Sequence, residues 1–364
     1  MAKRETEGQL VIPYPEFGRD LSDELSATKG FIEELQERRF VAVQGIPPEQ
    51  VDEMVRAYAD FMQLQSPPPD YLVERYTDQD WDEIDITPET DTVKYWHTYR
   101  SRVNRPGKPG GQTNRSLEND VLMAAGVLSH DNKREATDRK EFFHYTPDML
   151  TELQAIHEAN GWGDLPPELQ RFLELAQPIH ERGTEIMADC FYAMEDHVAF
   201  KGITKSLISD PDWRNNSPLR ILAYHTDSTT QSLGQLHRDK GTATLALDES
   251  HDGLRVSTGV DAEYDELSGG YVLRNKTEAS SDENMVLVER LRGQAAFFTA
   301  DGMRRETGID HPAVEPTYHD IIKVGDKEYI PGRVGRYAVI LFMNPPSGTF
   351  SSKASNHGAE GVAA

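Results

Sequence analysis

The sequence predicts an α+β protein in which a helix-rich first half precedes a β-rich second half. The strongest helical signal runs from Pro166 to Met194, where apolar residues recur every three or four positions behind two prolines suited to a first helical turn. After about residue 200, short strand-like segments follow one another, separated by turn residues. They cover residues 219–224, 242–247, 253–256, 270–273, 285–288, 295–298, 319–324 and 336–342. Short strands at this spacing are typical of a β-sandwich or jelly roll.

The first half alternates regular elements with irregular stretches. The triple proline at 67–69 ends a helix. Residues 70–140 hold an acidic patch and a Gly/Pro-rich loop, so they predict mostly irregular structure before order returns at 138–145. The expected elements are a strand at 9–13, a helix at 21–38, a strand at 39–43, a helix at 47–64 and a short helix near 117–128.

Size, charge and cysteine content narrow the class of protein. The 364 residues, 37% of them hydrophobic, allow two average domains or one large unit with a well-packed core. A formal net charge of -24 disfavours binding to nucleic acid or anionic lipid. The sequence shows neither a long apolar run nor a signal peptide, so no membrane span is expected. The single cysteine, Cys190, excludes an intrachain disulfide and fits a cytoplasmic location.

The feature that carries chemistry is a His-x-Asp pair, His237 and Asp239. Residues two apart in a strand point to the same face, so an imidazole and a carboxylate would project into one pocket. A further histidine from a distant strand would complete a 2-His-1-carboxylate facial triad, the usual cradle for a non-haem Fe(II) that activates O₂. The pair therefore predicts an iron site, provided that a second histidine is present.

Two histidines later in the chain could supply that third ligand. His311 lies in Gly-Ile-Asp-His-Pro, a loop signature, whereas His319 stands at the head of a β-rich run. Ligands on strands are held more rigidly than ligands on loops, which favours His319. His225 and His251 are interpreted as loop and turn residues rather than as ligands.

Arg336 begins the strand-like run Arg-Tyr-Ala-Val-Ile-Leu-Phe-Met. A buried arginine needs a carboxylate partner, so an inward-facing Arg336 would suit an acidic co-substrate. The pattern leaves open that Arg336 instead faces solvent or pairs with an acidic side chain of the protein.

These residues resemble the isopenicillin N synthase-like branch of the Fe(II)/2-oxoglutarate-dependent oxygenases. Members carry a His-x-Asp-x-Gly-x-x-Thr-Leu-Leu-x-x-Asp run that continues into Gly-Leu-Gln-Val. The residues in register with it are His237, Asp239, Gly241, Thr244, Leu245, Asp248, Gly253, Leu254 and Val256. The family's distal Pro-Thr-x-His matches 316–319, its Arg-x-Ser aligns with 336–338, and its Asn-x-Tyr aligns with 222–224. The resemblance covers most of residues 9–346.

The resemblance implies a double-stranded β-helix (jelly-roll, cupin-like) core with an N-terminal helical domain and a long supporting helix. It divides the chain into a helical domain at 1–200, an oxygenase domain at 201–346 and a flexible tail at 347–364. By the same resemblance, His237, Asp239 and His319 would be the catalytic Fe(II) ligands. 2-Oxoglutarate would chelate the metal and place its far carboxylate on Arg336 and Tyr224, and O₂ would take the last position.

The sequence departs from the family pattern at three places. Ala338 stands where the family has the Ser of Arg-x-Ser, and Leu222 replaces the Asn of Asn-x-Tyr. The spacing between His319 and Arg336 is longer than usual, which an inserted hairpin tip at 325–335 would explain. Because two co-substrate hydrogen bonds are missing, an isopenicillin N synthase-like Fe(II) oxidase that uses O₂ without 2-oxoglutarate is an alternative.

The implied reaction is hydroxylation, desaturation or ring formation on a small molecule, in specialised metabolism. Phe298, Arg220, Tyr95, Trp96 and the 257–284 insertion are candidates to line the substrate pocket, although the aromatic residues also suit core packing and the insertion also suits a solvated hairpin. A monomer or weak homo-oligomer is expected. The complete ligand set argues against a binding protein that has lost its metal, and no general base is evident for a zinc hydrolase.

Overall fold

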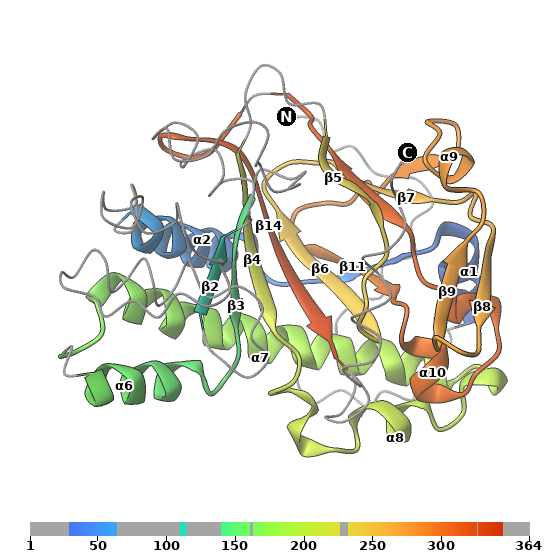
Figure 1. The fold of residues 1–364 in the computed structure, drawn as a ribbon, viewed down its shortest axis with the longest axis horizontal. Helices are drawn as coiled ribbons and strands as arrows, with labels where there is room; N and C mark the ends of the chain where they lie inside the picture. The colour runs from blue at the N-terminus through green and yellow to red at the C-terminus, as the bar shows by residue number, and fades with distance from the viewer. Residues whose placement is uncertain are drawn as a thin grey trace, which may run out of the picture.

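Two antiparallel sheets with facing inner surfaces form the centre of the molecule (Figure 1). The computed structural model describes residues 29–63, 110–113, 140–160, 163–225, 232–325 and 327–344. The larger sheet runs β1 (Val41–Gln44), β11 (Gln294–Thr299), β6 (Ala243–Glu249), β14 (Arg333–Met343), β4 (Leu219–His225), β3 (Lys140–Tyr145), β2 (Gly110–Thr113), with β13 (Glu328–Ile330) paired to β14. The smaller sheet runs β10 (Met285–Leu287), β7 (Leu254–Ser257), β12 (His319–Ile322), β5 (Ser232–His237).

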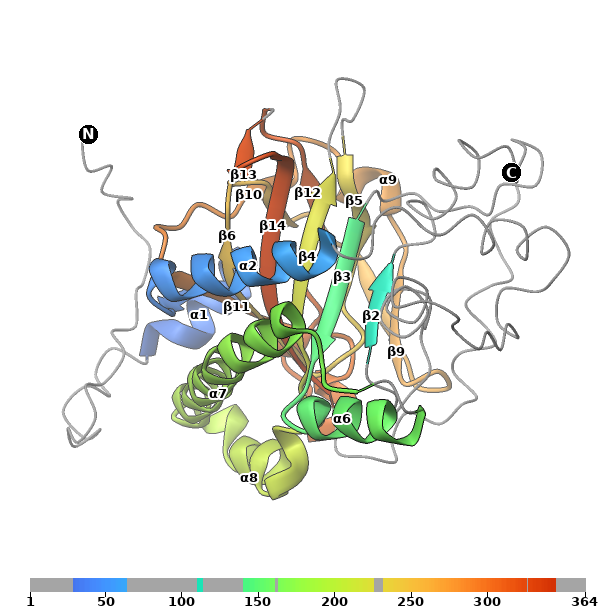
Figure 2. The same cartoon turned by 90° about the vertical axis from the view of Figure 1, so that its left-hand side faces the viewer.

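The outer face of the larger sheet is covered by helices, above all α1 (Lys29–Arg38), α2 (Pro48–Gln63) and α7 (Pro167–Glu195) (Figure 2). Phe172 of α7 packs against Phe61 of α2 and Phe143 of β3, with ring centroids 6.2 Å and 5.0 Å away. This apolar stripe follows the three- and four-residue spacing of the α7 sequence, so hydrophobic burial holds the helix on the sheet. The remaining helices are α6 (Met149–Asn160), α8 (Ile203–Ile208), α9 (Lys276–Ala279), α10 (Met303–Thr307), η5 (Val198–Phe200), η6 (Pro211–Trp213) and η7 (Pro312–Val314).

Alternation along a single strand separates the helix side of the large sheet from its inner side. Phe297 of β11 faces outward, where its ring lies 5.6 Å from Phe31 and 5.8 Å from Phe191. Its neighbour Phe298 faces inward and belongs to the core between the two sheets. That inner core also holds Leu233 and Ile321 of the smaller sheet, so the two sheets pack face to face.

The strand and helix predictions agree with the structure over most of the described chain. Each of the strand-like segments predicted after residue 200 is a strand, and the predicted long helix corresponds to α7. The helices expected at 21–38 and 47–64 correspond to α1 and α2, with α1 described from Lys29 onward. The 9–13 strand, the 117–128 helix, Tyr95, Trp96 and the 347–364 tail lie outside the described residues.

Some elements were not predicted, and some local predictions were wrong. His225, interpreted as a loop residue, is the last residue of β4, and the loop predicted near 105–112 contains the start of β2. Strands β5 and β8 (Ala262–Asp265) and helix α6 were missed because their sequences carry weak periodicity. His237 and Asp239 do not share a strand, since β5 ends at His237 and Asp239 lies in the turn that follows. The strands β1, β2 and β3 come from the range predicted as the helical domain, yet they extend the larger sheet.

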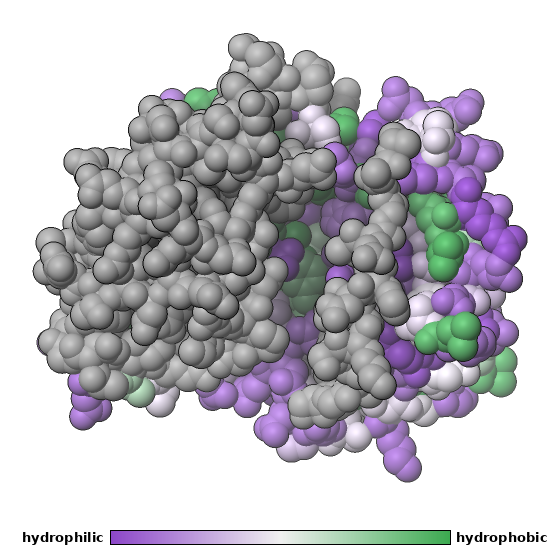
Figure 3. Space-filling view, in the orientation of Figure 1, coloured by the Kyte–Doolittle hydropathy of each residue, from purple (hydrophilic) through white to green (hydrophobic). Residues whose placement is uncertain are grey.

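Both predicted insertions form hairpins. In the 257–284 segment, β8 pairs with β9 (Gly270–Leu273), and Leu267 at the tip is 99% exposed. In the 325–335 segment, β13 pairs with β14 as expected for an inserted hairpin. Figure 3 shows the side of the molecule around β8, β9 and α9 as mostly hydrophilic, with small separate hydrophobic patches. Among the described residues, no helix is long and apolar enough to cross a membrane.

Candidate metal and co-substrate site

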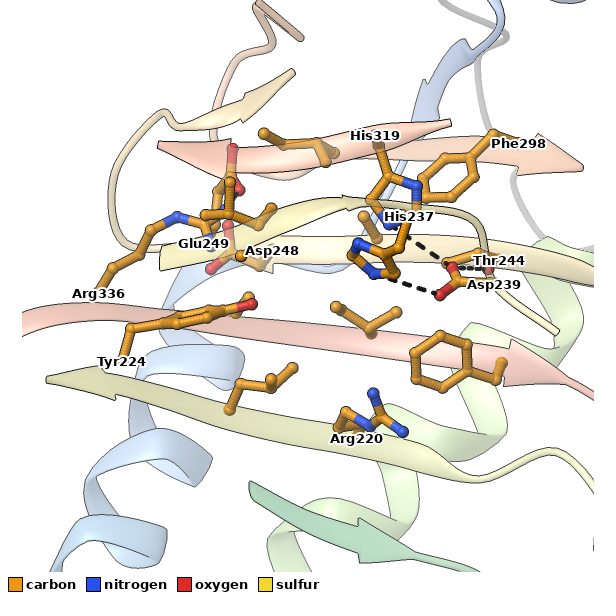
Figure 4. A pocket seen from close by; sticks show the side chains of 18 of the residues that line it. Arg220, Tyr224, His237, Asp239, Thr244, Asp248, Glu249, Phe298, His319 and Arg336 are labelled. Carbon is orange, nitrogen blue, oxygen red and sulfur yellow. Dashed lines mark hydrogen bonds and ion pairs between the residues drawn. The ribbon is translucent and has the colours of Figure 1, made fainter. Parts of the chain in front are cut away.

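One pocket lies between the two sheets and is lined from both of them (Figure 4). The larger sheet contributes side chains from β4, β6, β11 and β14, and the smaller sheet contributes them from β5, β7 and β12. His237, Asp239, His319, Arg336 and Tyr224 all line it, so the structure brings every predicted site residue to one cavity.

The three predicted metal ligands converge at one end of this pocket. His237 and His319 are cross-strand neighbours on β5 and β12, with ring centroids 4.3 Å apart. The Nε2 atoms of His237 and His319 each lie 3.9 Å from a carboxylate oxygen of Asp239. One ligand atom from each residue falls within 4.8 Å of the other two. This spacing suits three ligands on one side of a single ion.

Hydrogen bonds orient each ligand toward the shared point. Nδ1 of His237 lies 2.7 Å from the Gln235 carbonyl, and Nδ1 of His319 lies 3.1 Å from the Thr317 carbonyl. Because a carbonyl only accepts, both Nδ1 atoms donate to it, which leaves both Nε2 atoms facing Asp239. Thr244 Oγ1 donates to Asp239 Oδ2 over 2.6 Å, which fixes the carboxylate.

The environment keeps Asp239 ionised. Burial by itself would raise the pKa of this carboxyl, but His319, His237 and the Thr244 hydrogen bond outweigh it and lower the pKa below its usual value. Two imidazole nitrogens and one carboxylate with an open side are the donor set that suits a non-haem Fe(II). The residues present therefore fit the metal that the family resemblance implies.

The turn that carries Asp239 is held by backbone contacts. Asp301 N donates to Asp239 O over 2.9 Å, and Gly302 N donates to Gly241 O over 2.8 Å. A side chain at Gly241 would collide with the Met343 carbonyl, so glycine is needed for this close approach. These contacts place the carboxylate opposite the histidines although it lies outside the strand.

The other end of the pocket holds two buried arginines that share one carboxylate. The side chains of Arg336, Arg290 and Glu249 are 4%, 4% and 6% exposed. Glu249 Oε2 accepts a hydrogen bond from Arg336 Nη2 and lies 3.5 Å from Arg290 Nη2. Arg336 Nε also donates to the His251 carbonyl over 3.1 Å, and Arg290 Nη1 donates to the Ala246 carbonyl.

Three buried polar atoms of this cluster make no hydrogen bond. They are Arg336 Nη1, Arg290 Nη2 and Glu249 Oε1. Two cations and one anion leave one positive charge in excess, and burial lowers the pKa of Arg336 and brings the pKa of Arg290 to about 10. Because unpaired buried donors are costly, this end of the pocket is suited to an incoming carboxylate.

The two departures from the family pattern lie beside this cluster. Ala338 on β14 is the cross-strand partner of Leu222 on β4 and of Glu249 on β6. Neither Ala338 nor Leu222 offers a polar side chain. Glu249 lies beside Ala338 on β6, and Arg290 lies next to Glu249. Tyr224 keeps its expected place, with its ring centroid 5.5 Å from the Arg336 guanidinium carbon.

Sequence reasoning missed several pocket residues. Glu249 directly follows Asp248 in the family run, but the run alone does not indicate its pairing with Arg336. Arg290 lies in the loop before β11, where no pattern marks it. Asp248 itself lines the pocket but is engaged by Arg292 at 2.7 Å and Tyr337 at 2.9 Å. Arg220 and Phe298, both sequence candidates, also line the pocket, whereas the 257–284 hairpin contributes none of its lining residues.

Comparison with known proteins agrees with this picture. No family model matches the chain. A stretch of 104 residues, 25% of this chain and 30% of the relative, is 32% identical to a 2-oxoglutarate-dependent dioxygenase of Didymella fabae. The match therefore spans less than a third of that relative's length.

Solved structures show the same fold. A protein assigned to the 2OG-Fe(II) oxygenase family from Caulobacter crescentus has a TM-score of 0.52 at 15% identity, over 92% of this chain and 86% of its own. JOX2 in complex with 2OG, Fe and JA has a TM-score of 0.51 at 14% identity, over 93% of this chain and 76% of its own. The chain thus has the fold of the 2OG-Fe(II) oxygenases, and the resemblance drawn from its sequence is confirmed.

Proposed function

We propose that this protein is a non-haem Fe(II)- and 2-oxoglutarate-dependent dioxygenase that hydroxylates, desaturates or cyclises a small molecule. The observation that carries the proposal is a pocket with a 2-His-1-carboxylate set at one end and surplus positive charge at the other. A dicarboxylate needs both features, because one end chelates a metal and the other requires a cation.

His237, Asp239 and His319 would hold the Fe(II). When bound there, Fe(II) supplies the coupling of 2-oxoglutarate decarboxylation to the oxidation of a substrate by O₂. The chain contributes binding, orientation and the exclusion of water.

Arg336 and Arg290 would bind the far carboxylate of 2-oxoglutarate through the donors that make no hydrogen bond, Nη1 and Nη2 respectively. Leu222, Ala338 and Ile321 line the same pocket with apolar groups. An apolar wall excludes water from the middle of the co-substrate, which strengthens the charged contacts at its two ends.

An oxidase that uses O₂ without 2-oxoglutarate is the second candidate. The observation that favours it is Glu249, which already provides Arg336 with a carboxylate partner. Ala338 and Leu222 also favour the oxidase, since neither side chain can hydrogen-bond a co-substrate.

The test is an anaerobic titration of the Fe(II)-loaded protein with 2-oxoglutarate, followed through the visible charge-transfer band of the chelate. 2-Oxovalerate, which has the same chain length but no far carboxylate, is the matched ligand. We expect 2-oxoglutarate to bind at least about tenfold more tightly than 2-oxovalerate, and Arg336→Gln to remove that preference.

The control is Arg171→Gln, the same substitution on an arginine whose side chain is 64% exposed on α7. It should leave both dissociation constants unchanged. Iron binding with no 2-oxoglutarate band would reject the dioxygenase proposal in favour of the oxidase.

The proposal also includes a helical domain at 1–200, an oxygenase domain at 201–346 and a substrate from specialised metabolism. The end of α7 at Glu195 and the run of strands that begins with β4 at Leu219 support a boundary near residue 200. A truncated chain that begins at residue 201 would test it. A chain that folds on its own would support the boundary, whereas loss of folding would show that β1 and β3, which pair with β11 and β4, belong to the same unit.

A further inference from the structure

Arg220 is a third arginine in the pocket, and it lies on the metal side. It lies on β4 and, like Leu222 and Tyr224 on the same strand, lines the cavity. Figure 4 shows its guanidinium on the same side of the pocket as Asp239, while Arg336 and Glu249 lie at the opposite end. Burial lowers the pKa of Arg220, and the nearby Asp239 and Tyr224 act in the opposite direction.

Two aromatic rings hold the guanidinium from neighbouring strands. Its central carbon lies 4.4 Å from the ring centroid of Phe342 on β14 and 4.8 Å from that of Phe142 on β3. These strands flank β4 on its two sides, so the rings approach from opposite directions. Arginine stacks well on aromatic faces, and such contacts leave only the edges of the guanidinium for hydrogen bonds.

His144 occupies one of those edges. Arg220 Nε donates to His144 Nε2 over 2.6 Å. Burial and the adjacent Arg220 hold the pKa of His144 well below its usual value, so the imidazole is neutral and can accept. With two rings packed against the guanidinium and Nε bonded to His144, the edge that carries Nη1 and Nη2 remains for a further partner.

That edge has no carboxylate partner in the part of the chain that the structure describes. No described acidic side chain forms an ion pair with Arg220, whereas Arg336 and Arg290 share Glu249. Burial lowers the pKa of Arg220, which reflects the cost of holding the charge there. An arginine does not relieve this cost by losing its proton, so a bound anion is the remaining means.

We propose that Arg220 is an anion subsite for the substrate, and that the substrate is a small carboxylic acid with an apolar body. The paired Nη groups match a planar carboxylate by two parallel hydrogen bonds. The neighbouring side chains are apolar: Phe142 and Phe342 beside the guanidinium, Ile340 across from Arg220 on β14, and Leu222 on β4. The acid's oxidised carbon would lie a few bonds from its carboxylate, because Arg220 shares the metal side of the pocket. This inference rests on the proposed oxygenase function.

The test uses three acids, phenylacetate, 3-phenylpropanoate and hexanoate, each beside its own primary amide. Binding to the anaerobic Fe(II)–2-oxoglutarate complex is followed through the change in the visible band and by calorimetry. In the wild-type protein at least one acid should bind about tenfold more tightly than its amide. In Arg220→Gln this ratio should fall toward one while the dissociation constant for 2-oxoglutarate stays within about threefold.

Arg171→Gln is again the control and should keep the wild-type ratio. The inference is overturned if no acid binds better than its amide, including the case in which none binds, or if the ratio survives Arg220→Gln. If the ratio survives and the binding of 2-oxoglutarate weakens at least about tenfold in Arg220→Gln, Arg220 contacts the co-substrate instead of the substrate.

Failure of the proposed oxygenase function gives a result that differs from failure of the Arg220 subsite. In that case the wild-type protein shows no 2-oxoglutarate band, and the acid and amide pairs are compared by calorimetry on the protein loaded with Fe(II) alone. A retained acid preference that depends on Arg220 would then support the subsite without the co-substrate.

Discussion

The positive charge buried at each end of the pocket is compensated in a different way. At one end Arg336 and Arg290 share Glu249, so two cations are partly compensated within the protein. At the other end Arg220 is held by two phenylalanine rings and a neutral histidine, without an acidic partner among the described residues. At the first end, an incoming carboxylate would compete with Glu249 for the two arginines. The second end leaves its charge to be matched from outside.

This difference indicates separate ligands for the two ends. A co-substrate present at constant concentration can be bound by a cluster that is already mostly compensated. An uncompensated charge gives stronger recognition of an acidic substrate, because the site without the substrate keeps a buried charge that has no partner. The metal ligands lie at the same end of the pocket as Arg220 (Figure 4).

The largest expected effect is the loss of the metal from this arrangement. Asp239→Ala removes the carboxylate that faces both Nε2 atoms at 3.9 Å. Fe(II) affinity, measured by titration with an iron chelator, should fall more than about 100-fold, and 2-oxoglutarate should give no visible band. Thr244→Val, which removes only the hydrogen bond to Asp239, should cost about tenfold in affinity. Equal affinities in all three proteins would contradict the assigned ligand set.

A smaller effect separates the arginines at the co-substrate end. Arg290→Gln removes one donor that makes no hydrogen bond and leaves Arg336 paired with Glu249. The dissociation constant for 2-oxoglutarate should rise about tenfold in the anaerobic titration, while that for 2-oxovalerate stays unchanged. If both ligands weaken equally, Arg290 supports the fold of the pocket rather than the far carboxylate.

The smallest effect concerns a half-buried carboxyl group outside the pocket. Asp189 on α7 is half-buried, and burial raises its pKa from the ordinary value of 3.8 to about 6. Since the folded pKa exceeds the unfolded one, ionisation costs stability progressively from about pH 4 to pH 6 and fully above that. Asp189→Asn should therefore raise the free energy of unfolding by about 1 kcal/mol at pH 7.5, after allowance for solvent screening, and change it little near pH 4.

Denaturant unfolding at the two pH values checks this prediction. An equal effect at both would show that the substitution acts through packing rather than through charge. The contrast with Arg220 is instructive, because a buried carboxyl can be neutralised by a proton whereas a buried guanidinium cannot.

Local patterns in the sequence account for most of the fold that was predicted. The spacing of apolar residues in α7 and the short apolar runs of β6 and β14, bounded by turn residues, depend on residues a few positions apart, so local patterns reveal them. The His-x-Asp motif and His319 were found for the same reason, since each lies in a short run with a recognisable pattern. Even here the geometry differed in detail, because Asp239 reaches the site from a turn.

The sequence by itself determined the ligand types, the helix and strand content and the excess of negative charge. The tertiary structure decided which charges meet: Arg336 pairs with Glu249, 87 positions away, and Arg220 pairs with His144, 76 positions away. Whether a buried arginine is compensated depends on which strands are neighbours in the sheet, and strand order is not encoded in any local spacing. The assignment of one end to a co-substrate and the other to an acidic substrate therefore required the fold.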